Sequence, residues 1–158
     1  MTSQVWLCEN EFDPDRDLFC RIILESAHMS NMIIDPVHKL LFYTHKIKRA
    51  ASVPYYSTIH VASLDGTNSR QIYQVSDPRT GFVTGLNLDQ AAEEIFWIET
   101  QSRQEQQKIV LKRMSYMGEI LSEVSLAGLG NVTIGSGNSL IKVSVLKLKK
   151  LEIDFLSI

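Results

Sequence analysis

The sequence has few of the features that mark membrane-spanning, cystine-rich or nucleic-acid-binding proteins. Its two cysteines, Cys8 and Cys20, are too few for a disulfide framework or a cysteine-based zinc cluster. No apolar run approaches the roughly 20 residues needed to cross a bilayer. The first ten residues lack the basic and apolar regions of a signal peptide. With 16 basic and 18 acidic residues, the net charge of −2 argues against a nucleic-acid-binding surface.

The composition instead suits one folded domain, and the sequence contains an internal repeat. Its length of 158 residues is typical of a single domain, and its 44% hydrophobic content excludes global disorder. Asp35 and Asp89 begin similar segments and lie 54 residues apart, while Gly66 and Gly118 lie 52 apart. The two separations agree on a period of about 53 residues, which indicates stacked units that bury a core together.

Each repeat unit predicts four short β-strands. Alternating or β-branched apolar runs bounded by turn residues are typical of strands, and Asp65–Gly66 is a strong turn signal. We expect one unit over about 30–80 and another over about 81–125. The polar insertions at 46–58 and 100–108 are expected to be surface loops. The strands recognised in these two units lie near 40–44, 59–64, 70–75, 85–88, 95–98, 109–114 and 119–124.

The two ends of the chain have weaker patterns. Segments 4–8 and 18–24 have strand character, and segment 139–158 alternates apolar residues with lysines. Strands are the interpretation we favour for 139–158, with a helix as the alternative. We expect residues 1–29 and 126–158 to form degenerate or incomplete units.

The sequence contains none of the common catalytic or metal-binding motifs. No two of its histidines have the spacing of a zinc-protease helix. Gly135 and Gly137 are directly adjacent to a serine, whereas a Gly-x-Ser-x-Gly nucleophile elbow needs one residue between each glycine and the serine. The glycines at 128 and 130 do not extend to a dinucleotide-binding fingerprint, because Thr133 occupies the third position. We therefore expect no catalytic residue, no cofactor, no metal site and no enzymatic activity.

Two features bear on the cellular compartment. Asn131 begins an Asn-Val-Thr sequence that is glycosylated only in secreted proteins. Cys8 and Cys20 would pair in an oxidising compartment, and would be buried thiols in a reducing one. The sequence leaves both alternatives open.

The segment from Asp35 to His45, with the turn Leu64-Asp-Gly-Thr-Asn68, resembles the low-density lipoprotein receptor class B repeat, also called the YWTD repeat. The segment from Leu88 to Glu99 resembles a second copy. The resemblance covers about residues 30–125, and it implies an all-β, six-bladed propeller built from four-stranded antiparallel blades. A chain of this length holds about three such blades, which implies a partial propeller and a fragment of a larger protein.

The resemblance also assigns structural roles to individual residues. In the family, the aspartate that ends the Tyr-Trp-Thr-Asp motif ties neighbouring blades together by hydrogen bonds. His45 and Glu99 stand at that position here, with Tyr43 and Trp97 two residues before them. The complete set of repeat positions is Asp35, Tyr43, His45, Asp65, Gly66, Asp89, Trp97, Glu99 and Gly118.

The function implied by the resemblance is ligand binding without catalysis. Family members form parts of endocytic, Ros/sevenless-type and related receptors, so we expect a protein ligand or neighbouring receptor domains as partners, at the extracellular side of the plasma membrane. Pro54, Tyr55 and Tyr56 are candidate anchors for such a ligand, because aromatic residues dominate interfaces. The alternatives are an intracellular scaffold propeller in the cytoplasm and a calcium-dependent lactonase-type propeller enzyme.

Overall fold

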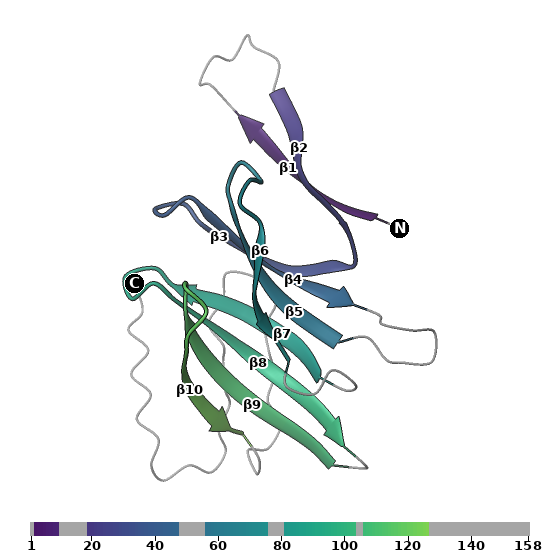
Figure 1. Cartoon of the computed structure of the whole chain (residues 1–158), viewed down its shortest axis with the longest axis vertical. Coiled ribbons are helices and arrows are strands. Elements are labelled where there is room, and N and C mark those ends of the chain that lie inside the picture. The colour runs from purple at the N-terminus through teal and green to yellow at the C-terminus, as the bar shows by residue number, and fades with distance from the viewer. Residues whose placement is uncertain (1, 10–18, 48–55, 76–80, 104–105, 127–158) are drawn as a thin grey trace.

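The computed structural model confirms the expected all-β fold (Figure 1). It describes residues 2–9, 19–47, 56–75, 81–103 and 106–126. Over these residues the chain forms ten β-strands and no helix, so the described part contains no apolar helix of the length that crosses a membrane. All pairings between neighbouring strands are antiparallel.

Two four-stranded sheets account for most of the described chain and have the topology of propeller blades. In each sheet every strand pairs with its neighbour in sequence, in the orders β3-β4-β5-β6 and β7-β8-β9-β10. We call these sheets blade 1 and blade 2. Blade 1 consists of β3 (Met29–Asp35), β4 (Leu40–Ile47), β5 (Tyr56–Ser63) and β6 (Arg70–Gln74). Blade 2 consists of β7 (Gly81–Asp89), β8 (Glu94–Arg103), β9 (Gln106–Ser115) and β10 (Ile120–Ser125).

The structure repeats itself with the spacing found in the sequence. The amide of Ser63 donates to Thr67 O at 2.9 Å, and the amide of Ser115 donates to Glu119 O at the same distance. Gly66 and Gly118 occupy equivalent turns with φ of +87° and +98°. Both conformations lie in the left-handed region that glycine tolerates best.

The residues ahead of blade 1 form a separate two-stranded sheet, the β1–β2 hairpin, from β1 (Thr2–Glu9) and β2 (Phe19–Ala27). Val5, Ile23 and Leu24 pack against the buried side chains of Leu41 and Tyr43. The hairpin therefore covers part of one face of blade 1. The contact is close, since a Cβ added to Gly66 would lie 2.0 Å from the carbonyl oxygen of Ile23.

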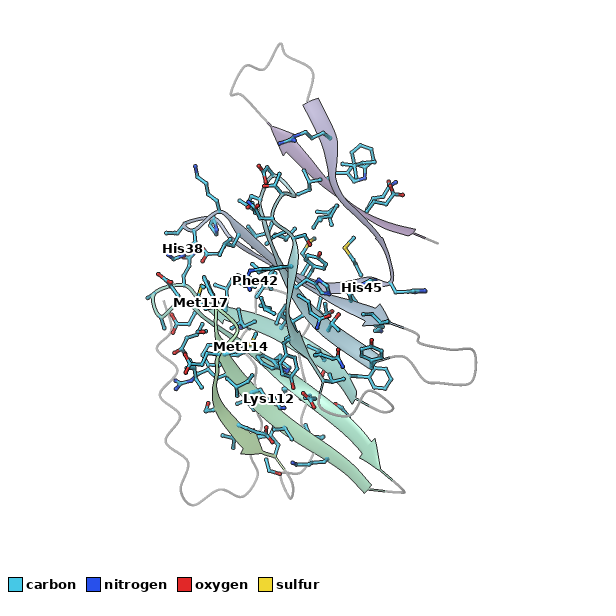
Figure 2. The ribbon with its side chains drawn as sticks, in the orientation of Figure 1. His38, Phe42, His45, Lys112, Met114 and Met117 are labelled. Carbon is cyan, nitrogen blue, oxygen red and sulfur yellow. The ribbon has the colours of Figure 1, made fainter. Side chains whose placement is uncertain are left out.

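The main core lies between the two blades. Side chains alternate between the two faces of a strand, so Phe42 and its cross-strand partner Val61 point from blade 1 toward blade 2. Ile95, Trp97 and Met114 of blade 2 meet them, and Figure 2 shows Phe42 and Met114 between the sheets. Phe42, Ile95, Trp97 and Met114 are fully buried, and burial of such side chains stabilises a domain by about 1.5–3 kcal/mol each.

One expectation is corrected by the strand bounds. The polar insertion at 100–108 is not a loop, because β8 and β9 continue into it and pair as far as Arg103↔Gln106. A polar segment can continue as a hairpin because its backbone groups hydrogen-bond to each other across the two strands. In the insertion at 46–58, β4 ends at Ile47 and β5 begins at Tyr56, and residues 48–55 lie outside the described chain.

Candidate functional site

The turns that join the strands of each blade at one end make a surface shared by both blades. A cavity of about 260 Å³ opens there, beside the β3–β4, β5–β6, β7–β8 and β9–β10 turns. His38 and Met117, at one end of the blades in Figure 2, belong to its lining. We call this region the turn surface and define it by His38, Asn68, Arg70, Glu93 and Met117.

Asp35 is the buried residue that organises the turn surface. Its Oδ1 accepts hydrogen bonds from the amides of Val37 at 2.9 Å and His38 at 3.1 Å, which closes the β3–β4 turn. The same oxygen accepts a bond from Gln90 Nε2 at 2.8 Å, and Oδ2 accepts one from the hydroxyl of Tyr116 at 2.7 Å. Gln90 and Tyr116 belong to blade 2, so Asp35 ties the two blades together.

The same contacts set the protonation of the groups around Asp35. Burial alone would raise the pKa of Asp35, but hydrogen bonds from Tyr116, His38 and Gln90 outweigh it and hold that pKa well below its usual range. The hydrogen bond between His38 Nδ1 and Asp35 Oδ2, at 2.7 Å, raises the pKa of His38. Burial, and then the bond to Asp35, raise the pKa of Tyr116. Asp35 is therefore a carboxylate at neutral pH.

The rim of the cavity carries charge of both signs. His38 Nε2 lies 3.4 Å from a carboxylate oxygen of Glu93, across the junction of the blades. Arg70 Nη2 lies 3.5 Å from the carbonyl oxygen of Tyr116, and no carboxylate of the described residues forms an ion pair with it. Met117 projects beside them with 80% of its surface exposed. This surface therefore offers an apolar contact next to a guanidinium.

A second polar contact between the blades lies deeper, at Glu99. The hydroxyl of Tyr73, on β6 of blade 1, donates to Glu99 Oε2 on β8 of blade 2. Lys112 Nζ lies 3.2 Å from the same carboxylate oxygen and donates to the Tyr73 hydroxyl at 2.8 Å. Burial and the bond to Glu99 raise the pKa of Tyr73 to about 12. Burial would lower the pKa of Lys112, but Tyr73 and Glu99 outweigh it and raise that pKa.

The two residues at the family's inter-blade position have different surroundings. Glu99 makes the cross-blade bond just described. His45 faces the other side of blade 1, where its ring meets that of His60 edge to face with 5.8 Å between centroids. His60 in turn stacks on Tyr43 at 5.2 Å and bonds Thr58 Oγ1 at 2.9 Å.

The other repeat positions are structural in these surroundings. Asp65 Oδ1 accepts bonds from the amide and hydroxyl of Thr67, and Asp89 Oδ1 accepts bonds from the amides of Ala91 and Ala92. Trp97 is fully buried in the core, where its ring packs on Tyr73 at 4.7 Å.

The candidate ligand anchors and the glycosylation sequence lie elsewhere. Tyr56 is buried in the core between the blades and is therefore a packing residue, not an exposed anchor. Pro54, Tyr55 and Asn131 lie outside the described residues. Cys8 and Cys20 are directly opposite each other in the β1–β2 register.

Sequence reasoning did not identify the partners of the acidic groups. Gln90, Tyr116, Tyr73 and Lys112 have no motif of their own. Their positions in the repeat were the available signal. Gln90 follows Asp89 in the second copy of the Asp35 turn, and Tyr116 lies two residues before Gly118 in the second copy of the Gly66 turn. Among the described residues, no group of three or more histidine, cysteine or acidic side chains is arranged to hold a metal ion.

Comparisons with known proteins give one structural likeness. No protein-family model matches the chain, and no curated protein matches it. The crystal structure of a nidogen/laminin complex contains a chain that aligns with a TM-score of 0.39 and 13% identity. The alignment covers 66% of this chain and 51% of that chain, so this chain spans about half its length.

Proposed function

We propose that this chain is part of a protein-binding propeller of an extracellular receptor, of the low-density-lipoprotein-receptor-related or Ros/sevenless-like kind, and that it binds a protein ligand without catalysis. The turn surface is the observation that carries this proposal. On this surface the exposed side chain of Met117 lies near the guanidinium of Arg70, and hydrogen bonds between the two blades hold the surrounding turns in place. Methionine and arginine are among the residues enriched in protein interfaces.

The rigidity of the turn surface supports a binding role. Asp35 is buried and receives hydrogen bonds from both blades, so the turns that carry His38 and Met117 are held in fixed relative positions. A surface that is already ordered loses little conformational entropy on binding. The exposed guanidinium of Arg70 favours a ligand with an acidic group beside an apolar side chain.

The binding test uses the purified 158-residue chain against an array of secreted and cell-surface ectodomains. We expect saturable binding to at least one ectodomain, weakened tenfold or more by Arg70→Glu and by Met117→Glu, because hot-spot residues dominate such affinities. Lys46→Glu is the matched control, since Lys46 is an exposed basic residue at the opposite end of β4. Equal weakening by Lys46→Glu, or no saturable binding, would contradict the proposal.

The extracellular context needs a separate measurement on the native protein. An antibody against residues 46–58 should detect a band far above 18 kDa that shifts on deglycosylation. The Cys8–Cys20 pair should also be oxidised. Directly opposed residues in antiparallel strands have Cα atoms about 4.5–5.5 Å apart, within the ~4.4–6.8 Å range of disulfides. An unglycosylated band near 18 kDa with two reactive thiols would favour the intracellular scaffold alternative.

A further inference from the structure

The β1–β2 hairpin has the same register irregularity as the last two strands of blade 1. Along β5 the register shifts after Ile59, where the pairing with β6 passes over Ile72. Along β1 the register shifts after Val5, where the pairing with β2 passes over Ile23. β1 and β5 are both eight residues long. The hairpin therefore matches β5–β6 in register, with β1 in the place of β5 and β2 in the place of β6.

The hairpin also contacts blade 1 in the way that β5–β6 contacts blade 2. A Cβ added to Gly66 would lie closest to the carbonyl oxygen of Ile23, and one added to Gly118 closest to that of Ile72. These two isoleucines are the residues that the registers pass over. The apolar residues that pack at equivalent places are Val5 and Ile59, Ile23 and Ile72, and Leu24 and Tyr73. Relative to blade 1, the hairpin thus has the position that β5–β6 has relative to blade 2.

The two strands that would precede the hairpin in a complete blade have no counterpart among the described residues. In blade 1, β5 pairs with β4 on one side and with β6 on the other, whereas β1 pairs only with β2. One edge of β1 therefore presents backbone N–H and C=O groups that no described strand pairs with. Such an edge is a template for pairing with another strand.

The part of blade 1 that these two strands would cover is apolar and exposed. Met32 and Ile34 of β3 lie on the face that the hairpin contacts, because their register partners Tyr43 and Leu41 pack against the hairpin. Met32 is 48% and Ile34 is 52% exposed. With the 54-residue spacing of the repeat, Met32 corresponds to Leu86 of blade 2, which is buried between the blades. The hairpin covers the rest of this face and leaves β3 open.

The interface between blade 1 and blade 2 shows what kind of element fits at the open place. Leu86 packs in one cluster with Phe42 and Leu40, which belong to the first two strands of blade 1. The element that supplies them is an antiparallel hairpin, β3–β4, with apolar side chains on the face turned toward blade 2. An element of the same kind therefore fits over Met32 and Ile34.

We propose that the β1–β2 hairpin is the second half of a further blade, and that a β-hairpin of a partner protein completes this blade by binding to the open edge of β1 and to Met32 and Ile34. One strand of the partner adds to β1 through backbone hydrogen bonds. Strand addition takes its affinity from these bonds and its specificity from alternate side chains. The partner segment is therefore a pair of alternating strands whose apolar face covers Met32 and Ile34. This site shares no residue with the turn surface.

The test measures binding of a synthetic peptide of residues 29–47, the β3–β4 hairpin, to the purified full chain by fluorescence anisotropy. We expect saturable binding that Met32→Glu and Ile34→Glu in the chain each weaken tenfold or more, because each places a carboxylate in an apolar contact. Val37→Glu is the matched control, since Val37 is 68% exposed but lies in the β3–β4 turn. Circular dichroism establishes that each variant chain is folded.

A variant of the peptide tests the same contact without altering the chain. Phe42→Glu in the peptide replaces the apolar side chain that packs on the facing blade, and it should also weaken binding tenfold or more. Hydrogen exchange should show that the bound peptide protects the backbone amides of β1 and leaves those of the other edge strand, β10, unchanged.

Four results would overturn the proposal. The first is the absence of saturable binding. The second is binding that Met32→Glu, Ile34→Glu and the Phe42→Glu peptide leave unchanged, and the third is binding without protection of β1. The fourth is self-association of the wild-type chain that Ile34→Glu abolishes in sedimentation equilibrium, because a second copy of the chain would then occupy the site.

Discussion

Blade 1 and blade 2 carry different polar groups at one equivalent place in their sheets. In blade 2 this position holds the buried pair of Glu99 and Lys112, which meets the hydroxyl of Tyr73 from blade 1. In blade 1 it holds His45 and His60, and burial, followed by the charge of His45, lowers the pKa of His60. The comparison teaches that a buried charge is retained at this position where a hydroxyl from the neighbouring blade bonds to it.

The largest effect is expected from removing the carboxylate of Glu99. Glu99→Leu removes one carboxylate partner of the buried Lys112, whose Nζ also lies 3.3 Å from a carboxylate oxygen of Glu123, and should lower the free energy of unfolding by about 3 kcal/mol. His45→Leu at the equivalent position should change it by less than about 1 kcal/mol. Urea denaturation of the two variants and the wild type measures both values. Equal losses would show that the two positions are energetically alike.

A comparison of the two turn aspartates should give the next largest difference. Asp35 and Asp89 both close a turn through backbone amides, but Asp35 is buried and also accepts bonds from Gln90 and Tyr116. Asp35→Ala should cost about 2–3 kcal/mol, because it leaves buried donors without acceptors. Asp89→Ala should cost about 1 kcal/mol, the usual value of a turn or cap contact. Thermal unfolding of both variants decides whether the cross-blade bonds make the difference.

The hydroxyl of Tyr73 should contribute less than either carboxylate. Tyr73→Phe keeps the ring on Trp97 and removes the bonds to Glu99 and Lys112, which should cost about 1–2 kcal/mol. Because Tyr73 and Glu99 share one contact, the Tyr73→Phe/Glu99→Leu double variant should lose less than the sum of the single losses. Strict additivity would mean that the hydroxyl and the carboxylate act independently.

The smallest effect is a pH dependence that arises from His38. Its pKa is raised in the folded protein by Asp35, so its contribution to stability is fully present below about pH 6.5 and is lost as the pH rises through the folded-state pKa. The urea midpoint of the wild type should therefore decrease slightly between pH 6 and pH 9. His38→Gln should remove this decrease, and His28→Gln should retain it. A decrease that persists in His38→Gln would assign it to another group.

The repeat and its turns were predictable from sequence because both are local. Asp35 and Asp89 close their turns with amides two and three residues later, and Gly66 and Gly118 occupy turns that need a positive φ. Residue identity and short spacing decide such contacts. The strands were predictable for the same reason, because each pairs with a strand next to it in the sequence.

The contacts between blades could not be predicted in the same way. Gln90 reaches Asp35 across 55 residues, and Tyr73 reaches Glu99 across 26, so neither pair has a spacing that a motif fixes. The resemblance placed His45 and Glu99 at one family position, yet a second blade stands opposite only Glu99 within the described chain. Which groups meet depends on how the sheets stack and twist, which strand patterns do not encode.

The local pairing of the strands also sets the order in which this chain can fold during synthesis. Blade 1 is complete once β6 ends at Gln74, before any strand of blade 2 has been made. Sheets with such short sequence separations form quickly, and domains fold progressively as the chain leaves the ribosome. Until β8 and β9 emerge, Phe42 and Ile59 are exposed on a finished sheet. Contact with chaperones, or with a neighbouring nascent chain on the same messenger RNA, is therefore favoured during that interval.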